Sequence, residues 1–264
     1  MNGHDKESAR ASVVMLAGEC EATDIVYHAL SQEFAVGAVI VEQRVARSTF
    51  LKSRFRRLGA TEVLGQIVFQ AAVAPVLRVL ARDRVAQIKR ENALRTDPID
   101  PKVVHRVSSA NADETLALLR SFNPAVVVVS GTRILSKRLL TSVGCPFINM
   151  HAGITPVYRG VHGGYWALAE NRPEQCGVTV HLVDPGVDTG GILGQALIHP
   201  SALDNFATYP LLQLAAGIPL LLTAVRDALA GNLTTIQAPD GESRQWYHPT
   251  AWGYVGRLLA SGIK

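Results

Sequence analysis

The sequence comprises 264 residues, 48% of them apolar, and carries a formal net charge of +4. This length and apolar fraction are enough to bury a large core and exclude an intrinsically disordered chain. The small net charge excludes a protein whose whole surface binds nucleic acid. We expect a cytoplasmic protein, because residues 1–10 are polar, no run of about 18 apolar residues is visible, and the three cysteines show no disulfide or metal-ligand spacing.

The first part of the chain predicts a strand, a helix and a second strand at residues 12–17, 23–30 and 36–41. The turn after the first strand carries Glu19 and Glu21 and lacks a glycine-rich fingerprint. Two carboxylates would repel a phosphate group there, which argues against a nicotinamide dinucleotide.

Residues 44–95 form a basic segment with twelve Lys or Arg and three acidic residues. Its middle, 63–77, is uncharged and mostly apolar at helical spacing, and Pro75 should kink or end that helix. The segment predicts a helical insertion of two or three helices within an α/β domain. A solvated basic face is the favoured interpretation of its role, with a membrane surface or a phosphate-bearing substrate as the alternatives.

The rest of the chain alternates strands with helices and ends in helices. Strands are predicted at 103–107, 125–129, 145–150 and 177–183. Helices are predicted at 111–121, at 211–229 with interruptions at Gly217 and Pro219, and at 250–260, with a loop at 239–247. This pattern predicts an α/β fold: a Rossmann-like, mostly parallel sheet with helices on both faces. One domain is expected over 11–200, including the insertion at 44–95, and a C-terminal helical extension over 201–264.

Polar residues gather where two of these strands end. Asn149 and His151 alternate along one strand, so their side chains should share a face, and Asp184 and Asp188 follow the next strand. An amide can donate to a developing oxyanion, and an imidazole paired with a carboxylate can move a proton. This combination suits acyl transfer, whereas no paired ligands stand at metal-binding spacing.

Several motifs in order then identify a resemblance. They are 149–151 (NMH), 156–160 (PVYRG), Trp166-Ala167, 177–181 (GVTVH) and 184–193 (DPGVDTGGIL), with a weaker match at 130–136. In these residues the chain resembles the folate-dependent formyltransferase family, which includes glycinamide ribonucleotide, methionyl-tRNA and amino-sugar N-formyltransferases. The clear similarity covers about 124–200. It implies that Asn149, His151 and Asp188 are the catalytic residues.

The resemblance also implies a co-substrate, N10-formyltetrahydrofolate, and its pocket. The residues implied as contacts are Thr132, Arg133, Ile134, Leu135, Asp184, Pro185, Gly186 and Val187. The amine-acceptor side departs from the family pattern at 152–155 and 161–165, so the acceptor is not implied. Arg159, His162 and Tyr165 are the candidate substrate contacts. For His181 we expect a hydrogen-bonded core role, with support of the folate loop as the alternative.

We therefore expect an N-formyltransferase that acts on a primary amine of a small molecule, best guessed as a nucleotide- or lipid-linked amino sugar. Alternatives are glycinamide ribonucleotide formyltransferase, formyltetrahydrofolate hydrolase and a non-catalytic folate-binding protein. No nucleic-acid partner is expected, because the chain after Gln195 lacks the strand pattern of the barrel-like domain of methionyl-tRNA formyltransferases. A weak membrane-surface contact through the basic insertion and an oligomer stay open.

Overall fold

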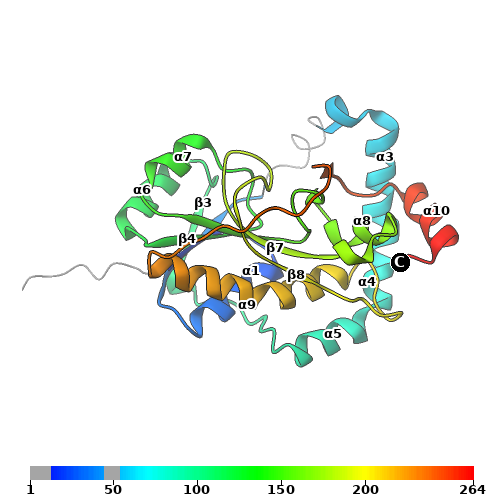
Figure 1. Ribbon diagram of the computed structural model, residues 1–264. Helices are drawn as coiled ribbons and strands as arrows, with labels where there is room; N and C mark the ends of the chain where they lie inside the picture. The colour runs from blue at the N-terminus through cyan, green and yellow to red at the C-terminus, as the bar shows by residue number, and fades with distance from the viewer. Residues whose placement is uncertain (1–12, 45–53) are drawn as a thin grey trace, which may run out of the picture.

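The computed structural model describes residues 13–44 and 54–264 and is built around a seven-stranded sheet (Figure 1). The strands are β1 (Val13–Gly18), β2 (Val36–Glu42), β3 (Val104–Val107), β4 (Val126–Ser130), β5 (Phe147–His151), β7 (Gly177–Leu182) and β8 (Ile192–Leu197). Their order is β3-β2-β1-β4-β5-β7-β8; the first five are parallel to one another, β7 is antiparallel to β5, and β8 is antiparallel to β7. The predicted fold class is confirmed.

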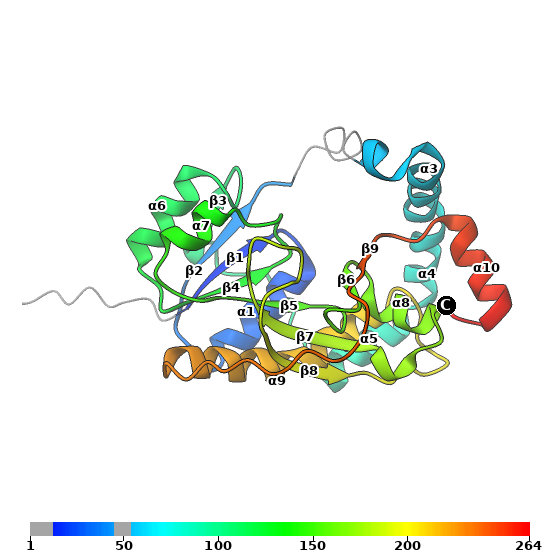
Figure 2. The ribbon, with the colours of Figure 1, turned by 45° about the horizontal axis from the view of Figure 1, so that its top comes forward.

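Helices cover both faces of the sheet (Figure 2). On one face lie α1 (Glu21–Ser31) and α9 (Tyr209–Leu229), and on the other lie α6 (Asp113–Phe122) and α7 (Lys137–Ser142). Along β1, Val13, Met15 and Ala17 face the first layer, while Val14 and Leu16 face the second. This explains why the strand is an unbroken apolar run, since both of its faces are buried.

The predicted interruption of α9 is wrong, because the helix is continuous through Gly217 and Pro219. A Cβ on Gly217 would lie 2.3 Å from the Met150 sulfur, so this glycine allows the helix to approach β5 closely. Pro219 removes one backbone donor, but the helix is packed on the sheet along its length. The domain boundary at 200/201 stays a prediction, although α9 belongs to the same core as β1 and β4.

The described part of the basic segment is helical, as predicted. It comprises α3 (Ala60–Val68), a π-helical turn η1 (Phe69–Val73), α4 (Ala74–Leu80) and α5 (Arg82–Glu91). Pro75 neither ends nor breaks the helix, because it stands in the first turn of α4, directly after the π-helical turn. Residues 1–12 and 45–53, which include the expected polar tail and part of the basic segment, lie outside the described residues.

Two helical runs are long and apolar enough, by length and composition, to cross a membrane, contrary to the sequence-based expectation. One is α9, whose buried side belongs to the sheet core. The other is 60–80, where Phe69 and Leu77 are buried in an aromatic cluster with Tyr165, Phe206 and Tyr254. The 60–80 helix is therefore packed against the body of the protein along one side.

A short 3-10 helix, η2 (Pro101–Val103), leads into β3 at one edge of the sheet. The remaining elements are β6 (Arg159–Gly160), α8 (Gly163–Ala169), η3 (Pro173–Gln175), β9 (Gln245–Trp246) and α10 (Ala251–Ser261). The expected loop at 239–247 contains β9, which pairs in parallel with β6. In both views α10 stands beside α3 and α4 at one edge of the molecule (Figures 1 and 2).

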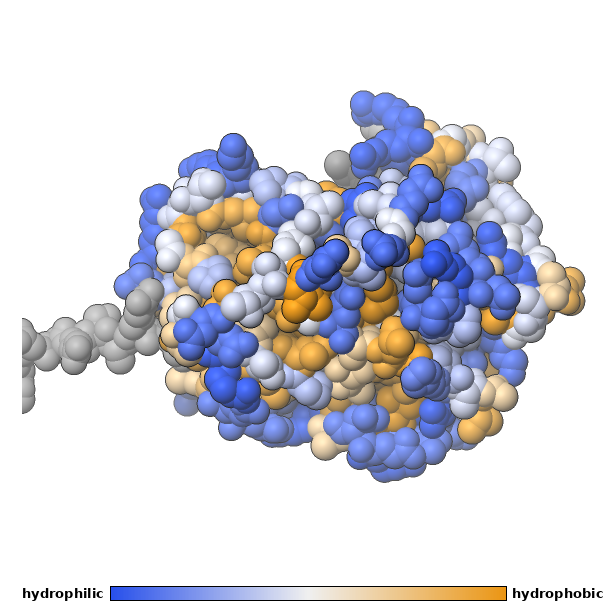
Figure 3. All heavy atoms as spheres, in the orientation of Figure 1, coloured by the Kyte–Doolittle hydropathy of each residue, from blue (hydrophilic) through white to orange (hydrophobic). Residues whose placement is uncertain are grey.

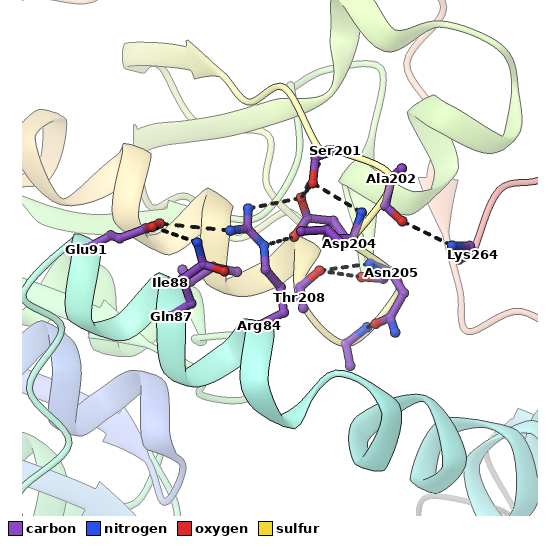
Figure 4. A network of polar contacts seen from close by, with 12 residues as sticks. Arg84, Gln87, Ile88, Glu91, Ser201, Ala202, Asp204, Asn205, Thr208 and Lys264 are labelled. Atoms are coloured by element: carbon purple, nitrogen blue, oxygen red, sulfur yellow. Dashed lines mark hydrogen bonds and ion pairs between the residues drawn. The ribbon is translucent and has the colours of Figure 1, made fainter.

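A polar network joins α5 to the loop before α9 (Figure 4). The Arg84 guanidinium donates from Nε and Nη2 to the two carboxylate oxygens of Asp204 at 2.8 and 3.2 Å. The Asp204 side chain is 1% exposed, and it also accepts from the amide and hydroxyl of Ser201. Burial opposes ionisation of Asp204, but Arg84 and Ser201 outweigh it, so the pKa of this carboxyl is lowered.

Replacement of this carboxylate should destabilise the fold. Asp204→Asn leaves Arg84 with a buried, weakened partner, and we expect a loss of about 3 kcal/mol in the free energy of unfolding, measured by urea denaturation. Asp113→Asn is the matched control, because the exposed Arg138–Asp113 pair should contribute less than about 1 kcal/mol. Because the pKa of Asp204 is lower in the folded than in the unfolded protein, the stability that this carboxylate contributes is lost as pH falls below about 4. The free energy of unfolding of Asp204→Asn should therefore fall less on acidification than that of the wild type. Equal stability of the two variants would contradict the assignment.

Candidate active site

The pairing of β5 with β7 brings the predicted polar residues to one edge of the sheet. Asn149 stands opposite His181 in the antiparallel register, and His151 stands opposite Thr179. Cross-strand partners point to the same face, and Asn149, His151 and His181 all line one cavity. The expectation that Asn149 and His151 share a face is confirmed.

Asp188 comes to the same place from the loop between β7 and β8. Its φ of 51° lies in the left-handed region, which aspartate tolerates better than most residues. One carboxylate oxygen, Oδ2, accepts from the amide of Gly160 at 2.9 Å and lies 3.3 Å from His151 Nδ1. The other, Oδ1, lies 3.5 Å from His181 Nε2. Asp188, distant in the sequence from Asn149 and His151, therefore meets both at one cavity.

The electrostatics of this group favour an ionised Asp188 beside a neutral His151. Burial acts to raise the pKa of Asp188, but the His181 and His151 rings and the Gly160 amide together lower it. Burial lowers the pKa of His151, and the Asp188 carboxylate only partly opposes this. His151 Nε2 lies 2.7 Å from the Tyr158 carbonyl and can donate to it, while Nδ1 faces the Asp188 carboxylate at 3.3 Å. A proton that arrives at Nδ1 would be shared with the carboxylate.

His181 belongs to this site as well as to the core. Its side chain is 3% exposed, and Nδ1 lies 2.7 Å from the Leu182 carbonyl, which assigns a proton to Nδ1. Nε2 can then accept from the Asn149 amide nitrogen at 3.2 Å. His181 therefore has hydrogen bonds in the core, as expected, and it also contacts Asn149 and Asp188, two of the three predicted catalytic residues. Antiparallel pairing of the two strands was the signal that could have revealed this.

The cavity in front of these residues has a volume of about 510 Å³. The expected folate contacts that line it are Thr132, Arg133, Ile134, Leu135, Asp184, Gly186 and Val187; Pro185 does not. The Arg133 side chain is already paired, because its Nε donates to the buried carboxylate of Glu42. Asp184 holds its loop closed by accepting from the Gly186 amide and the Thr189 hydroxyl.

A second cavity of about 780 Å³ adjoins the first and shares Gly131 to Ile134, Val187 and His248 with it. The residues that line the second cavity but not the first include Arg44, Arg54 and Tyr247. Of the expected substrate contacts, His162 lines the first cavity.

Arg159 and Tyr165 line neither of these two cavities, and their contact with the substrate stays a prediction. Arg159 donates to the Val187 carbonyl at 3.0 Å and to the Ser243 hydroxyl at 2.9 Å, so its guanidinium anchors the loop that carries Asp188. Tyr165 is 1% exposed and its ring packs on Trp166, Phe206 and Tyr254.

Sequence reasoning missed two residues that form a polar group with His162 at the cavity wall, Gln70 and His248. His248 Nδ1 lies 2.8 Å from Gln70 Nε2 and accepts from this amide, and it also lies 2.9 Å from His162 Nε2. Gln70 comes from the π-helical turn η1, a feature that often marks functional sites. Burial, with added repulsion from neighbouring cationic groups, lowers the pKa of His162 to about 3 and that of His248 to about 4. No short-range sequence pattern links these three residues.

Among residues 13–44 and 54–264 there is no group of three or more His, Cys, Asp or Glu side chains placed to hold a metal ion. An amide donor, a buried imidazole and an ionised carboxylate line the first cavity at the edge of a Rossmann-like sheet, and these groups suit acyl transfer.

The comparisons with known proteins agree with that class. Residues 56–209, more than half of the chain, match the formyl transferase family, and the chain belongs to this family. The match extends well upstream of the 124–200 similarity expected from the motifs and includes α3 to α5. A methionyl-tRNA formyltransferase of Synechococcus sp. (strain JA-3-3Ab) is 34% identical over 184 residues, which are 68% of this chain and 51% of that protein. The chain thus spans about half the length of this curated relative.

Solved structures show the same fold. A sugar N-formyltransferase from a Shewanella species aligns with a TM-score of 0.54 at 13% identity, covering 89% of this chain and 76% of that one. The phosphoribosylglycinamide formyltransferase of Streptococcus pneumoniae TIGR4 aligns with a TM-score of 0.52 at 19% identity, covering 83% and 99%. At these identities the likeness describes the fold.

The histidines at the cavity wall should remain neutral over an unusually wide range of pH. We expect no titration of the His162 and His248 imidazoles between pH 8 and about 5 in nitrogen NMR spectra. In urea-unfolded protein both should titrate near pH 6.5. Because the unfolded chain then binds more protons, these two residues should destabilise the fold as pH drops below about 6.5. Titration of either imidazole near pH 6.5 in the folded protein would contradict the burial of His162 and His248.

Proposed function

We propose that this protein is an N-formyltransferase that moves the formyl group of N10-formyltetrahydrofolate to a primary amine of a small molecule. The observation that carries the proposal is the meeting of Asn149, His151 and Asp188 at the first cavity, next to a second one. Membership in the formyl transferase family supports the reaction class. We further propose that the protein acts in the cytoplasm.

The first cavity fits the folate co-substrate, which would supply the formyl group. Its wall includes Val129, Leu135 and Val183, an apolar surface suited to a flat ring. The loop of Asp184 to Val187, held closed by Asp184 and Arg159, can offer main-chain donors and acceptors to the ring edge. Pre-formed loops of this kind lower the cost of binding.

The residues divide the transfer between them. Asn149, oriented by His181, can donate a second N–H to the formyl oxygen as negative charge develops there. The ionised Asp188 accepts the proton that the attacking amine loses and shares it with His151 Nδ1. A carbon–nitrogen bond forms to the acceptor, the one to the donor breaks, and the proton passes to the departing nitrogen. His151 Nε2 already donates to Tyr158, so this ring serves the proton more directly than the oxyanion.

The second cavity supports an acceptor that carries negative charge. Arg44 and Arg54 line it, and the carboxylate of Glu19 beside them is paired with Arg106. A nucleotide- or lipid-linked amino sugar combines a primary amine with a diphosphate, which such arginines bind well. Methionyl-tRNA is the second candidate, because the relative at 34% identity bears that name. We favour a small acceptor and no nucleic-acid partner, with glycinamide ribonucleotide and water as further alternatives.

An acceptor screen tests the proposed function. We expect release of tetrahydrofolate, followed by absorbance, when the protein is given N10-formyltetrahydrofolate and a nucleotide-linked amino sugar. Release without any amine would identify a hydrolase, and release with methionyl-tRNA or glycinamide ribonucleotide alone would assign that acceptor. Absence of release with the whole panel would contradict the proposal.

Asn149→Ala should lower turnover on the order of a hundredfold or more, because removal of one oxyanion donor costs about 3 kcal/mol in activation free energy. The thermal unfolding midpoint should change little, since the side chain is only partly buried. Asn232→Ala, at an exposed position outside both cavities, is the matched control and should retain wild-type turnover. Wild-type turnover of Asn149→Ala would contradict the role of Asn149 as an oxyanion donor.

A further inference from the structure

An apolar stripe runs along the outer side of the 60–80 helix. Its large members, spaced three or four residues apart within α3 and within α4, are 38–73% exposed: Leu64, Ile67, Val68, Val76, Val79 and Leu80. Ala71, Ala72 and Pro75, also exposed, stand between them. Isolated exposed apolar residues are ordinary, but a continuous row on one helix marks an interaction surface.

The stripe continues onto α10. Trp252, Val255 and Leu259 follow one another at helical spacing and are 50%, 44% and 82% exposed. Trp252 packs directly on α3, because a Cβ on Gly65 would come within 2.5 Å of its ring. Figure 3 shows hydrophobic residues at the right-hand edge of the molecule, over α10. Two neighbouring helices therefore present apolar residues at the same edge of the protein.

The surroundings of the stripe are basic. Residues 54–83 contain five arginines (54, 56, 57, 78 and 82) and two acidic residues, Glu62 and Asp83. Arg56 and Arg57 precede α3, and Arg78 and Arg82 lie near the end of α4; all four are exposed. An apolar face bordered by arginines, with a tryptophan at its margin, is the combination that binds anionic lipid surfaces.

The helix cannot cross a bilayer while the protein keeps this fold. Phe69 is 0% exposed, Leu77 is 9% exposed, and Gln70 holds His248 at the cavity wall. One side of the helix is thus packed on the protein, and within residues 13–44 and 54–264 the apolar stripe on its other side is exposed. This corresponds to a helix that lies in the plane of a membrane surface.

We propose that the stripe on 60–80 and α10 docks the protein on an anionic membrane surface. Apolar side chains would enter the boundary between headgroups and acyl chains, and the arginines at both ends would contact lipid phosphates. The proposal does not depend on the proposed formyl transfer, since its test measures lipid binding.

Vesicle flotation of the full chain tests the proposal. The probes are phosphatidylcholine vesicles with and without phosphatidylglycerol. We expect flotation with the anionic vesicles that weakens with added salt, and much less with phosphatidylcholine alone. Absence of flotation with the anionic vesicles would overturn the proposal.

Two pairs of variants separate the apolar from the charged contribution. Val76→Glu/Leu80→Glu should reduce the bound fraction at least about tenfold, because two charges replace inserted aliphatic groups. Arg56→Gln/Arg57→Gln should reduce anionic-vesicle binding about fivefold per arginine while sparing the apolar stripe. The matched control is Ile236→Glu, an exposed aliphatic position away from the stripe.

The unfolding midpoint of each variant shows whether it is folded. If Val76→Glu/Leu80→Glu does not fold, Leu80→Glu alone replaces it, because position 80 is 73% exposed. Equal flotation of the stripe variant and the Ile236→Glu control would overturn the proposal. The proposal would also be overturned if the protein forms a dimer without lipid, and the stripe substitutions dissociate this dimer without loss of vesicle binding. That result would assign the face to a second copy of this chain.

Discussion

The carboxylate of Asp188 ties together three separate parts of the chain. It accepts from the Gly160 amide of β6, lies against His151 of β5 and approaches His181 of β7. A buried carboxylate requires such partners, since isolated burial of its charge would be prohibitive. The loop that carries it is fixed in turn by Arg159 and by the internal bonds of Asp184. The geometry of the site thus follows from satisfying one buried charge.

The sequence predicted the central sheet and the three side chains that meet at its edge. Valine-rich runs such as 126–129 specify strands buried on both faces, and the alternation of Asn149 with His151 specifies a shared face. β8 escaped prediction because its Gly194 and Gln195 interrupt the apolar pattern. β9 has two residues and exists through pairing with β6, which no local pattern encodes.

The packing on the acceptor side follows least from the sequence, for a physical reason. Tyr165 is a candidate substrate contact because it lies in 161–165, the segment that the family resemblance places on the acceptor side. Its burial against Tyr254 depends on α10, almost ninety residues further along the chain. The same holds for His248, which meets Gln70 across 178 residues. Contacts of this range arise from tertiary packing, and residue spacing within a single sequence does not reveal them.

Burial of His248 also affects the charge of the wall that both cavities share. Burial lowers the pKa of His248, and the ring stays uncharged with Gln70 donating to its Nδ1, as does His162 beside it. An approaching ammonium ion therefore meets no cationic imidazole on this wall, while the anionic Asp188 lies across the first cavity. For the amine acceptor that we propose, these two imidazoles would add no positive charge to the wall, and the carboxylate that would take its proton lines the same cavity.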